Sequence, residues 1–297
     1  MPSANRGRAG LLDHLKAWAL YPLPHHLLSR LVLALTRLEC PRLVPPLIRL
    51  FSRHFQVNLA EAREPDPAAY SSFNAFFTRA LRPGARPLDE AVDSILSPAD
   101  GTVSQCGTIE DGRLFQAKGH DYSLLELLGG DAERAACFEG GSFSTIYLSP
   151  RDYHRVHMPL AGRLRETVYV PGRLFSVAPH TVRTVPRLFA RNERLVCRFD
   201  TEQGPMAVIL VGAIFVACIE TIWTGVATPP HTRRIRVEPP PDEVNLARGA
   251  ELGRFNMGST VILLFGKDRA RWEPACGAGA AVRMGQRIGR IRQETEG

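Results

Sequence analysis

The sequence predicts an α+β protein, in which a β-rich, compact sandwich or barrel-like domain follows an N-terminal helical segment. Short apolar runs punctuated by Gly and Pro dominate from about residue 97 onward, and regular helical periodicity is nearly absent after Leu128. Apolar residues at helical spacing gather instead before residue 58. At 297 residues, 44% of them hydrophobic, the chain is long enough for a full core with an appendage. We therefore expect a helical region over 1–58 and a β-rich domain over 59–297.

Three short helices are expected in the N-terminal region, over 11–19, 26–38 and 44–55, with prolines between them. None could cross a membrane, because Arg30 and Arg37 leave only six uncharged residues between them. No signal peptide is recognisable. Apolar helices with interleaved arginines are typical of segments that lie on an anionic lipid surface. We expect 1–58 to associate with a membrane; the alternative is an ordinary helical subdomain packed on the main body.

The remaining elements follow in order. Residues 72–79 predict a short helix, and 97–103 predict a turn that enters a strand. Further strands are expected over 143–148, 164–170, 195–200, 206–211, 214–222 and 260–265, each bounded by Gly, Pro or Asp.

Charge and cysteine usage limit the classes of partner. The net charge of +7 favours an anionic partner, and the absence of a recognisable nucleic-acid-binding motif favours a lipid surface over nucleic acid. The six cysteines form no CxxC pair, so we expect free thiols in a reducing compartment and no zinc ribbon.

Two stretches could carry chemistry. Gly258 and Ser259 stand immediately before the apolar run 260–265. They predict either a tight turn or a serine that attacks its own preceding carbonyl, which would require a nearby base. His154 and His157 lie three residues apart within Arg151–Pro159. A histidine there could be a base, a structural residue at a β corner, or a metal ligand together with His180, Asp100 or Asp152.

The chain resembles the phosphatidylserine decarboxylase family, specifically the bacterial, membrane-associated proenzymes, from about Ser72 to Phe265. The matching blocks are Ser72–Arg79, Ser97–Gly101, Gln116–His120, Tyr147–Pro159, Tyr169–Gly172, Leu188–Arg194 and Gly258–Thr260. In the family's common Leu-Gly-Ser-Thr tetrapeptide, Met257 stands here in place of Leu. Met is similar in volume, so we expect little effect on cleavage.

The resemblance implies a zymogen that cleaves itself between Gly258 and Ser259 into a β chain (1–258) and an α chain (259–297). Asp100, His157 and Ser259 would form the self-cleavage triad, with His157 held by Asp100. Ser259 would become a covalent pyruvoyl cofactor, and no metal would be needed. The enzyme would be a carboxy-lyase that converts phosphatidylserine to phosphatidylethanolamine and CO₂ through a Schiff base. His154 is the candidate acid of the decarboxylation.

The resemblance also implies a lipid substrate, α and β chains that stay together, a homodimer, and a peripheral location on the cytoplasmic face of the bacterial cell membrane. Three alternatives stay open. The pyruvoyl chemistry could act on a soluble amino acid, His154, His157 and an Asp could form a metal-dependent hydrolase, or the chain could be an unprocessed β-rich binding module.

Overall fold

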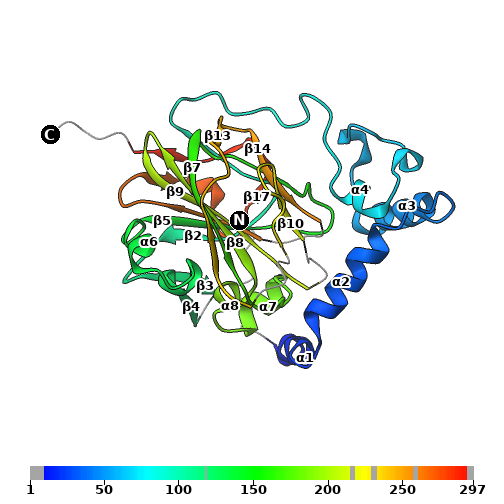
Figure 1. Cartoon of the computed structure of the whole chain (residues 1–297), viewed down its shortest axis with the longest axis horizontal. Coiled ribbons are helices and arrows are strands. Elements are labelled where there is room, and N and C mark those ends of the chain that lie inside the picture. Colours follow the sequence, from blue (N-terminus) through cyan, green and yellow to red (C-terminus); the bar gives the residue numbers. More distant parts are fainter. Residues whose placement is uncertain (1–9, 118, 215–217, 229–232, 257–259, 293–297) are drawn as a thin grey trace.

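A nine-stranded antiparallel sheet is the largest element of the protein in this computed structural model, which describes residues 10–117, 119–214, 218–228, 233–256 and 260–292 (Figure 1). In spatial order its strands are β12 (Arg236–Glu238), β7 (Gly162–Val170), β8 (Arg194–Thr201), β9 (Gly204–Val211), β15 (Thr260–Phe265), β5 (Ser142–Tyr147), β2 (Gly101–Thr108) and β17 (Ala281–Val282), and β13 (Asn245–Leu246) also pairs with β7.

Three smaller sheets complete the strands. They are β11 (Gly225–Val226), β10 (Ile219–Thr221), β14 (Glu251–Phe255) and β6 (Arg155–His157); β1 (Ser94–Leu96), β18 (Arg287–Ile291) and β16 (Ala270–Trp272); and the hairpin of β3 (Arg113–Ala117) and β4 (His120–Ser123). The helices are α1 (Leu11–Leu20), α2 (His25–Thr36), α3 (Val44–Phe55), α4 (Phe73–Phe77), α5 (Leu124–Leu127), α6 (Ala132–Ala136), α7 (Pro179–Thr184) and α8 (Leu188–Arg191), with short 3₁₀ turns η1 (Leu59–Glu61), η2 (Pro67–Ala69) and η3 (Pro274–Cys276).

Strand β15 lies at the centre of the large sheet. It pairs with β5 on one side and β9 on the other, and all six of its residues are buried. An apolar, β-branched-rich run suits a strand that is covered on both faces. Every ladder partner of β15 precedes residue 258, so the segment after the expected cleavage point is built into the middle of the fold.

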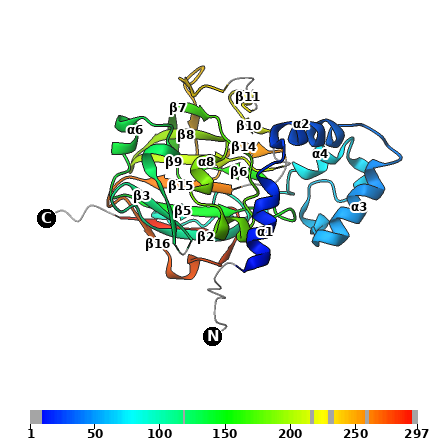
Figure 2. The ribbon, with the colours of Figure 1, turned by 90° about the horizontal axis from the view of Figure 1, so that it is seen from below.

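Helices α1 to α4 lie along one side of the sheet body, as two perpendicular views show (Figures 1 and 2). A separate small core joins α3 to α4, and it consists of Val44, Ile48, Val57, Phe73, Phe76 and Phe77. This core connects residues on both sides of position 58. Among the described residues, no helix is both long enough and apolar enough to span a bilayer.

Helix α2 has an inverted distribution of polar and apolar side chains. Leu27, Leu31 and Leu35 are 66%, 56% and 57% exposed, whereas His25 and Ser29 are 2% and 0% exposed. His25 is buried because its ring packs edge-on against Phe175 and its Nε2 lies 2.6 Å from the Leu20 carbonyl oxygen. The leucine face therefore points away from the protein's own core.

The predicted α+β class is confirmed, with helices first and a β-rich body after them. Most strands begin and end within two residues of the expected positions. The strand expected over 214–222 is wrong in extent, because the described part of it forms only the three-residue β10 and then turns, leaving Ile222 exposed. The six cysteines are free thiols, as expected.

Candidate active site

Two of the predicted site positions, 100 and 259, directly precede strands that begin at the same end of the large sheet. Thr102 in β2 is aligned with Tyr147 in β5, and Tyr147 is aligned with Thr260 in β15. Strands β2 and β15 therefore both begin at this end, separated by one strand. Because neighbouring strands lie about 4.8 Å apart, the chain enters β2 and β15 at points about 10 Å apart. Asp100 directly precedes β2, and position 259 directly precedes β15.

The predicted cleavage residues, Gly258 and Ser259, lie outside the described residues, together with Met257. The residues on either side are held firmly. Thr260 is hydrogen-bonded into the ladders of β5 and β9. Asn256 is buried, and its amide nitrogen donates to Glu220 Oε1 at 2.9 Å, while its amide oxygen accepts from Asn74 Nδ2 at 2.9 Å. Both residues that flank the expected cleavage point are therefore held by hydrogen bonds.

Asp100 is a buried carboxylate in a charged pair. Arg86 donates to it through Nε at 2.8 Å and through Nη2 at 2.5 Å, and the backbone N–H of Met284 donates at 2.9 Å. Arg86 also donates to Glu61 at 2.7 Å. Gly101 is required next to Asp100, since a Cβ there would lie 2.4 Å from the Tyr147 carbonyl oxygen. The hydrogen bond to Asp100 is the first cause of a raised Arg86 pKa.

His157 ends β6 and is almost fully buried. Its Nδ1–H donates to the Gly249 carbonyl at 2.9 Å, and its Nε2 accepts from the Tyr153 hydroxyl at 3.1 Å. A carbonyl only accepts, so this arrangement fixes the tautomer that leaves the lone pair on Nε2. Burial lowers the pKa of His157, while the carboxylates of Glu251 and Asp100 act in the opposite direction.

Asp100 and His157 share no side-chain hydrogen bond among the described residues, although the charge of Asp100 acts on His157, so their pairing in the self-cleavage stays a prediction. Within the described part of the chain, Asp100 bonds to Arg86 and Met284, whereas the ring of His157 bonds to Gly249 and Tyr153. A doubly bonded guanidinium is a stronger partner for a carboxylate than a neutral imidazole. The two residues are neighbours nevertheless, because the His157 backbone N–H donates to the Pro98 carbonyl at 2.8 Å.

His154 is completely buried and has an unusual environment. Its ring packs on Phe77 with 4.1 Å between ring centres, and Nδ1–H donates to the Asp152 carbonyl at 2.8 Å. Nε2 has no hydrogen-bond partner among the described residues. Burial and then the charge of Arg79 lower the pKa of His154 to about 3. The Phe255 N–H donates to the His154 carbonyl at 3.0 Å, which places His154 beside the strand that leads to the expected cleavage point.

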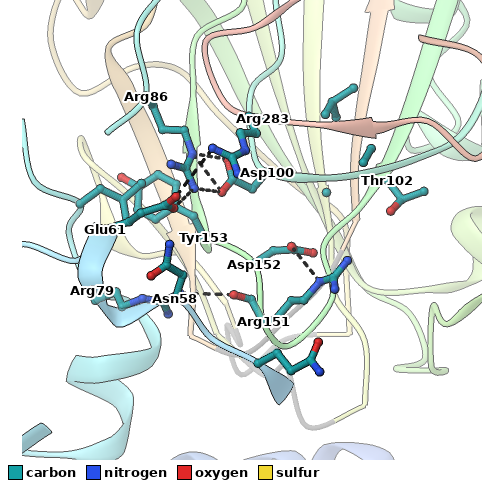
Figure 3. Close-up of a pocket in the computed structure, with 15 residues that line it drawn as sticks. Asn58, Glu61, Arg79, Arg86, Asp100, Thr102, Arg151, Asp152, Tyr153 and Arg283 are labelled. Atoms are coloured by element: carbon teal, nitrogen blue, oxygen red, sulfur yellow. Dashed lines mark hydrogen bonds and ion pairs between the residues drawn. The ribbon is translucent and has the colours of Figure 1, made fainter. Parts of the chain in front are cut away.

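A cavity of about 300 Å³ adjoins Asp100 and Tyr153 (Figure 3). It is lined by Gln56, Asn58, Glu61, Arg79, Leu81, Arg86, Asp100, Gly101, Thr102, Arg151, Asp152, Tyr153, Ala281, Val282 and Arg283. Asp152 accepts from the backbone N–H and the hydroxyl of Ser149, each at 2.7 Å. Burial raises the pKa of Asp152.

The metal-site interpretation gains no support from the described residues, in which no group of three or more His, Cys, Asp or Glu side chains could hold a metal ion. The two histidines instead direct their nitrogens at different partners. His157 binds Tyr153 and Gly249, whereas His154 binds the backbone of Asp152.

Sequence comparison now identifies the family. The profile described as phosphatidylserine decarboxylase matches residues 73–290, which include this end of the sheet, both histidines and the cavity wall after α4. The chain belongs to the phosphatidylserine decarboxylase family. A second profile, described as PSD, matches residues 15–56, the region of α1 to α3.

Curated relatives extend this match over most of the chain. The phosphatidylserine decarboxylase proenzyme of Azotobacter vinelandii is 61% identical over 272 residues, which cover 90% of this chain and 94% of the relative. The proenzyme of Pseudomonas entomophila is 60% identical with the same coverage, and that of Stutzerimonas stutzeri is 57% identical over 281 residues, or 93% and 94% of the two chains. The predicted resemblance is confirmed.

Sequence reasoning missed three residues that organise this family site. Arg86 binds Asp100, Tyr153 binds His157, and Asn256 holds the chain just before the expected cleavage point. Tyr153 and Asn256 could have been noticed, since they lie next to His154 and Met257. Arg86 has no predicted site residue beside it in the sequence, so nothing there indicated its role.

Proposed function

We propose that this protein is a self-processing phosphatidylserine decarboxylase that works on a lipid surface. Ser259 would become its pyruvoyl group after cleavage of the Gly258–Ser259 bond. The observation that carries the proposal is that Asp100 and position 259 precede strands that begin at the same end of the large sheet, and that His157 in β6 bonds to Pro98 beside Asp100, in a chain of the decarboxylase family.

His157 is the base of the self-cleavage. Its Nε2 carries the lone pair, because Nδ1–H is committed to Gly249. Once Nε2 is released from the Tyr153 hydroxyl, it would take the proton from Ser259 Oγ as that oxygen attacks the Gly258 carbonyl carbon. It would return the proton to the Ser259 nitrogen as the C–N bond breaks, converting the amide to an ester. The negative charge of Asp100 favours the imidazolium that forms. Removal of the Ser259 Cα proton then expels the Gly258 carboxylate, separates the two chains and leaves a dehydroalanine. This tautomerises to an imine, and water converts the imine to the pyruvoyl ketone with release of ammonia.

The surroundings fit a carbonyl group built into the start of β15. Residues 256 and 260 fix the chain on both sides, and His154 Nε2 is a buried nitrogen without a partner among the described residues. The pyruvoyl group would supply a ketone that condenses with the substrate amine and accepts the electron pair left when CO₂ departs.

His154 would handle protons beside that group. With a pKa of about 3 it is neutral near pH 7, and its Nε2 can only accept a proton at first. The substrate amine arrives as an ammonium and must lose a proton before it reacts. An imidazole with this pKa is too weak a base to take that proton from an ammonium, so His154 would serve as the acid that gives a proton to the substrate carbon after CO₂ has left, once its Nε2 has been protonated.

The N-terminal helices would hold the protein on the membrane. Exposed leucines of α2, together with Leu11 and Trp18 of α1 and Leu47 and Leu50 of α3, would provide the apolar side chains for this contact. We retain residues 1–58 as the membrane-associating region and 59–297 as the catalytic domain. The six free thiols support a location on the cytoplasmic face.

We further propose that the α and β chains stay associated and that two copies form a homodimer. Chain association follows from β15, which is bonded on both sides by β-chain strands. The homodimer rests on the frequency of twofold assemblies.

The decisive assay compares substrates. Purified protein is supplied with phosphatidylserine in mixed micelles, with free serine and with other soluble amino acids, and CO₂ release is measured. We expect release only from phosphatidylserine. Release from a soluble amino acid alone would favour the alternative pyruvoyl enzyme, and no release from any substrate, together with bound metal in the purified protein, would favour the metal-dependent hydrolase.

A further inference from the structure

Arg79 is a buried cation that has no part in the proposed self-cleavage. It follows α4, and its side chain is only 5% exposed. Its guanidinium lies over the Phe76 ring at 5.2 Å and donates from Nη2 to the Arg151 carbonyl at 3.3 Å. Nε has no partner in the described part of the chain. Burial lowers the pKa of Arg79, while the charges of nearby acidic groups, among them Asp100 and Asp152, act in the opposite direction without forming an ion pair.

The other three arginines that line the cavity each face a carboxylate. Arg86 pairs with Asp100 at 2.5 Å and with Glu61 at 2.7 Å. Arg151 lies 3.8 Å from Asp152, and Arg283 lies 3.7 Å from Glu61. Within the described residues Arg79 alone among these four has no ion pair. The cavity wall thus holds four guanidiniums and three carboxylates, and the surplus positive charge is on Arg79.

The cavity is bordered both by residues that follow helix α3 and by Arg79, whose charge acts on His154. Gln56 and Asn58 line it, and they directly follow α3, whose Leu47 and Leu50 are exposed. On the other side, the charge of Arg79 reaches His154 and adds to the effect of burial on its pKa. Figure 3 shows Arg79 and Asn58 at one end of the cavity, with Arg86 and Asp100 above them.

We propose that Arg79 binds the phosphodiester of the substrate head group in this cavity, an inference that rests on the proposed function. A phosphodiester keeps its negative charge throughout the reaction, so a guanidinium can hold it from binding to release. The substrate carboxylate is a poor partner for the same group, because an ion pair would stabilise the charge that must leave as CO₂. Arg79 would therefore select for substrates with a phosphodiester and orient the head group relative to His154.

The test measures ligand binding without turnover. Glycerophosphoethanolamine carries the phosphodiester of the product head group, ethanolamine lacks it, and inorganic phosphate lacks the amine. Dissociation constants for all three are measured by calorimetry on the wild-type protein, Arg79→Gln and Arg79→Lys. Arg82→Gln is the matched control, since Arg82 is exposed and does not line the cavity.

We expect Arg79→Gln to weaken glycerophosphoethanolamine binding about 10- to 100-fold, the usual value of a charged hydrogen bond, and to leave ethanolamine binding unchanged. Arg79→Lys should lose less, and Arg82→Gln nothing. Equal weakening of both amines would indicate a structural role and overturn the proposal. If Arg79→Gln does not fold, unchanged phosphodiester selectivity in Arg79→Lys overturns it as well.

The remaining outcomes separate the possible anions and the two proposals. Inorganic phosphate binding as tightly as glycerophosphoethanolamine, and also through Arg79, would assign the cavity to a free anion and overturn the head-group assignment. Because binding is measured without turnover, wild-type protein that binds the phosphodiester through Arg79 but releases no CO₂ from phosphatidylserine would contradict the proposed function and leave the binding site standing.

Discussion

Strand β15 and helix α2 are both largely apolar, but the fold places their apolar side chains in opposite surroundings. Every residue of β15 is buried between β5 and β9, whereas α2 buries His25 and Ser29 and exposes its leucines. Exposed apolar surface of this kind marks an interaction site. The comparison separates the molecule into a sheet body, in which we propose that the chemistry takes place, and a helical region with exposed apolar side chains, which we propose contacts a lipid surface.

The largest effect is expected when His157, the proposed base in the sheet body, is removed. His157→Ala should slow self-cleavage about 1,000-fold, because general-base catalysis is worth roughly 10²–10⁴-fold. The fraction of uncleaved chain is followed over time on denaturing gels. His54→Ala, at an exposed position in α3, is the control and should cleave normally. Rapid cleavage of His157→Ala would assign the base to another residue.

The helical region is tested by making its exposed face polar. The triple variant Leu27→Gln, Leu31→Gln and Leu35→Gln should bind anionic vesicles about 100-fold more weakly, since burying a leucine is worth roughly 1.5–3 kcal/mol and these side chains are half exposed. Vesicle co-sedimentation measures the effect. Self-cleavage should be unchanged, and so should vesicle binding by Val92→Gln, which removes an exposed apolar side chain from the sheet body. Undiminished binding by the triple variant would contradict the lipid role of α2.

A third test addresses the ion pair between Arg86 and Asp100. Arg86→Gln leaves a buried carboxylate without its cation, so the free energy of unfolding should fall by about 3 kcal/mol. Denaturant titration in a Ser259→Ala background keeps every variant a single chain. Arg287→Gln, which removes a half-buried arginine that lies near carboxylates elsewhere in the body, should lose much less. Equal losses would show that the Arg86–Asp100 pair contributes no more to the free energy of unfolding than the contacts of Arg287.

The smallest effect concerns pH. The pKa of His154 is lowered to about 3 in the fold, while an unfolded histidine titrates near 6.5. Between these values the unfolded chain binds the extra proton and the folded chain does not, so the stability that is fully present above pH 6.5 declines as the pH falls. The unfolding midpoint of Ser259→Ala should therefore drop more between pH 7 and pH 5 than that of Ser259→Ala with His154→Gln. Parallel curves would place His154 in a hydrated environment.

The sequence predicted the positions of helices and strands better than it predicted which of their side chains are buried. Apolar runs such as 260–265 are long and bounded by turn residues, so their strands were predictable from local pattern alone. In α2 the spacing of the leucines predicted a helix, but the buried face depends on Phe175, which is far away in the chain. The run 214–222 failed because apolar composition does not show where a strand turns.

The site residues show the same limit. His154, His157 and Asp100 were predicted, since they stand in recognisable blocks. The burial of His154 was not predictable, because charged residues surround it in sequence while Phe77 covers it in space. Arg86 and Asp100 are 14 residues apart in the sequence, and only the fold of the chain between them brings their side chains together. A local sequence pattern cannot predict such a contact.

The most direct test of the account is the intact mass of the purified protein under denaturing conditions, beside Ser259→Ala. We predict two chains for the wild type, 1–258 and a 259–297 fragment that begins with a pyruvoyl group and resists Edman degradation, and a single full-length chain for the variant. An unbroken wild-type chain, or cleavage of Ser259→Ala at the same bond, would contradict it.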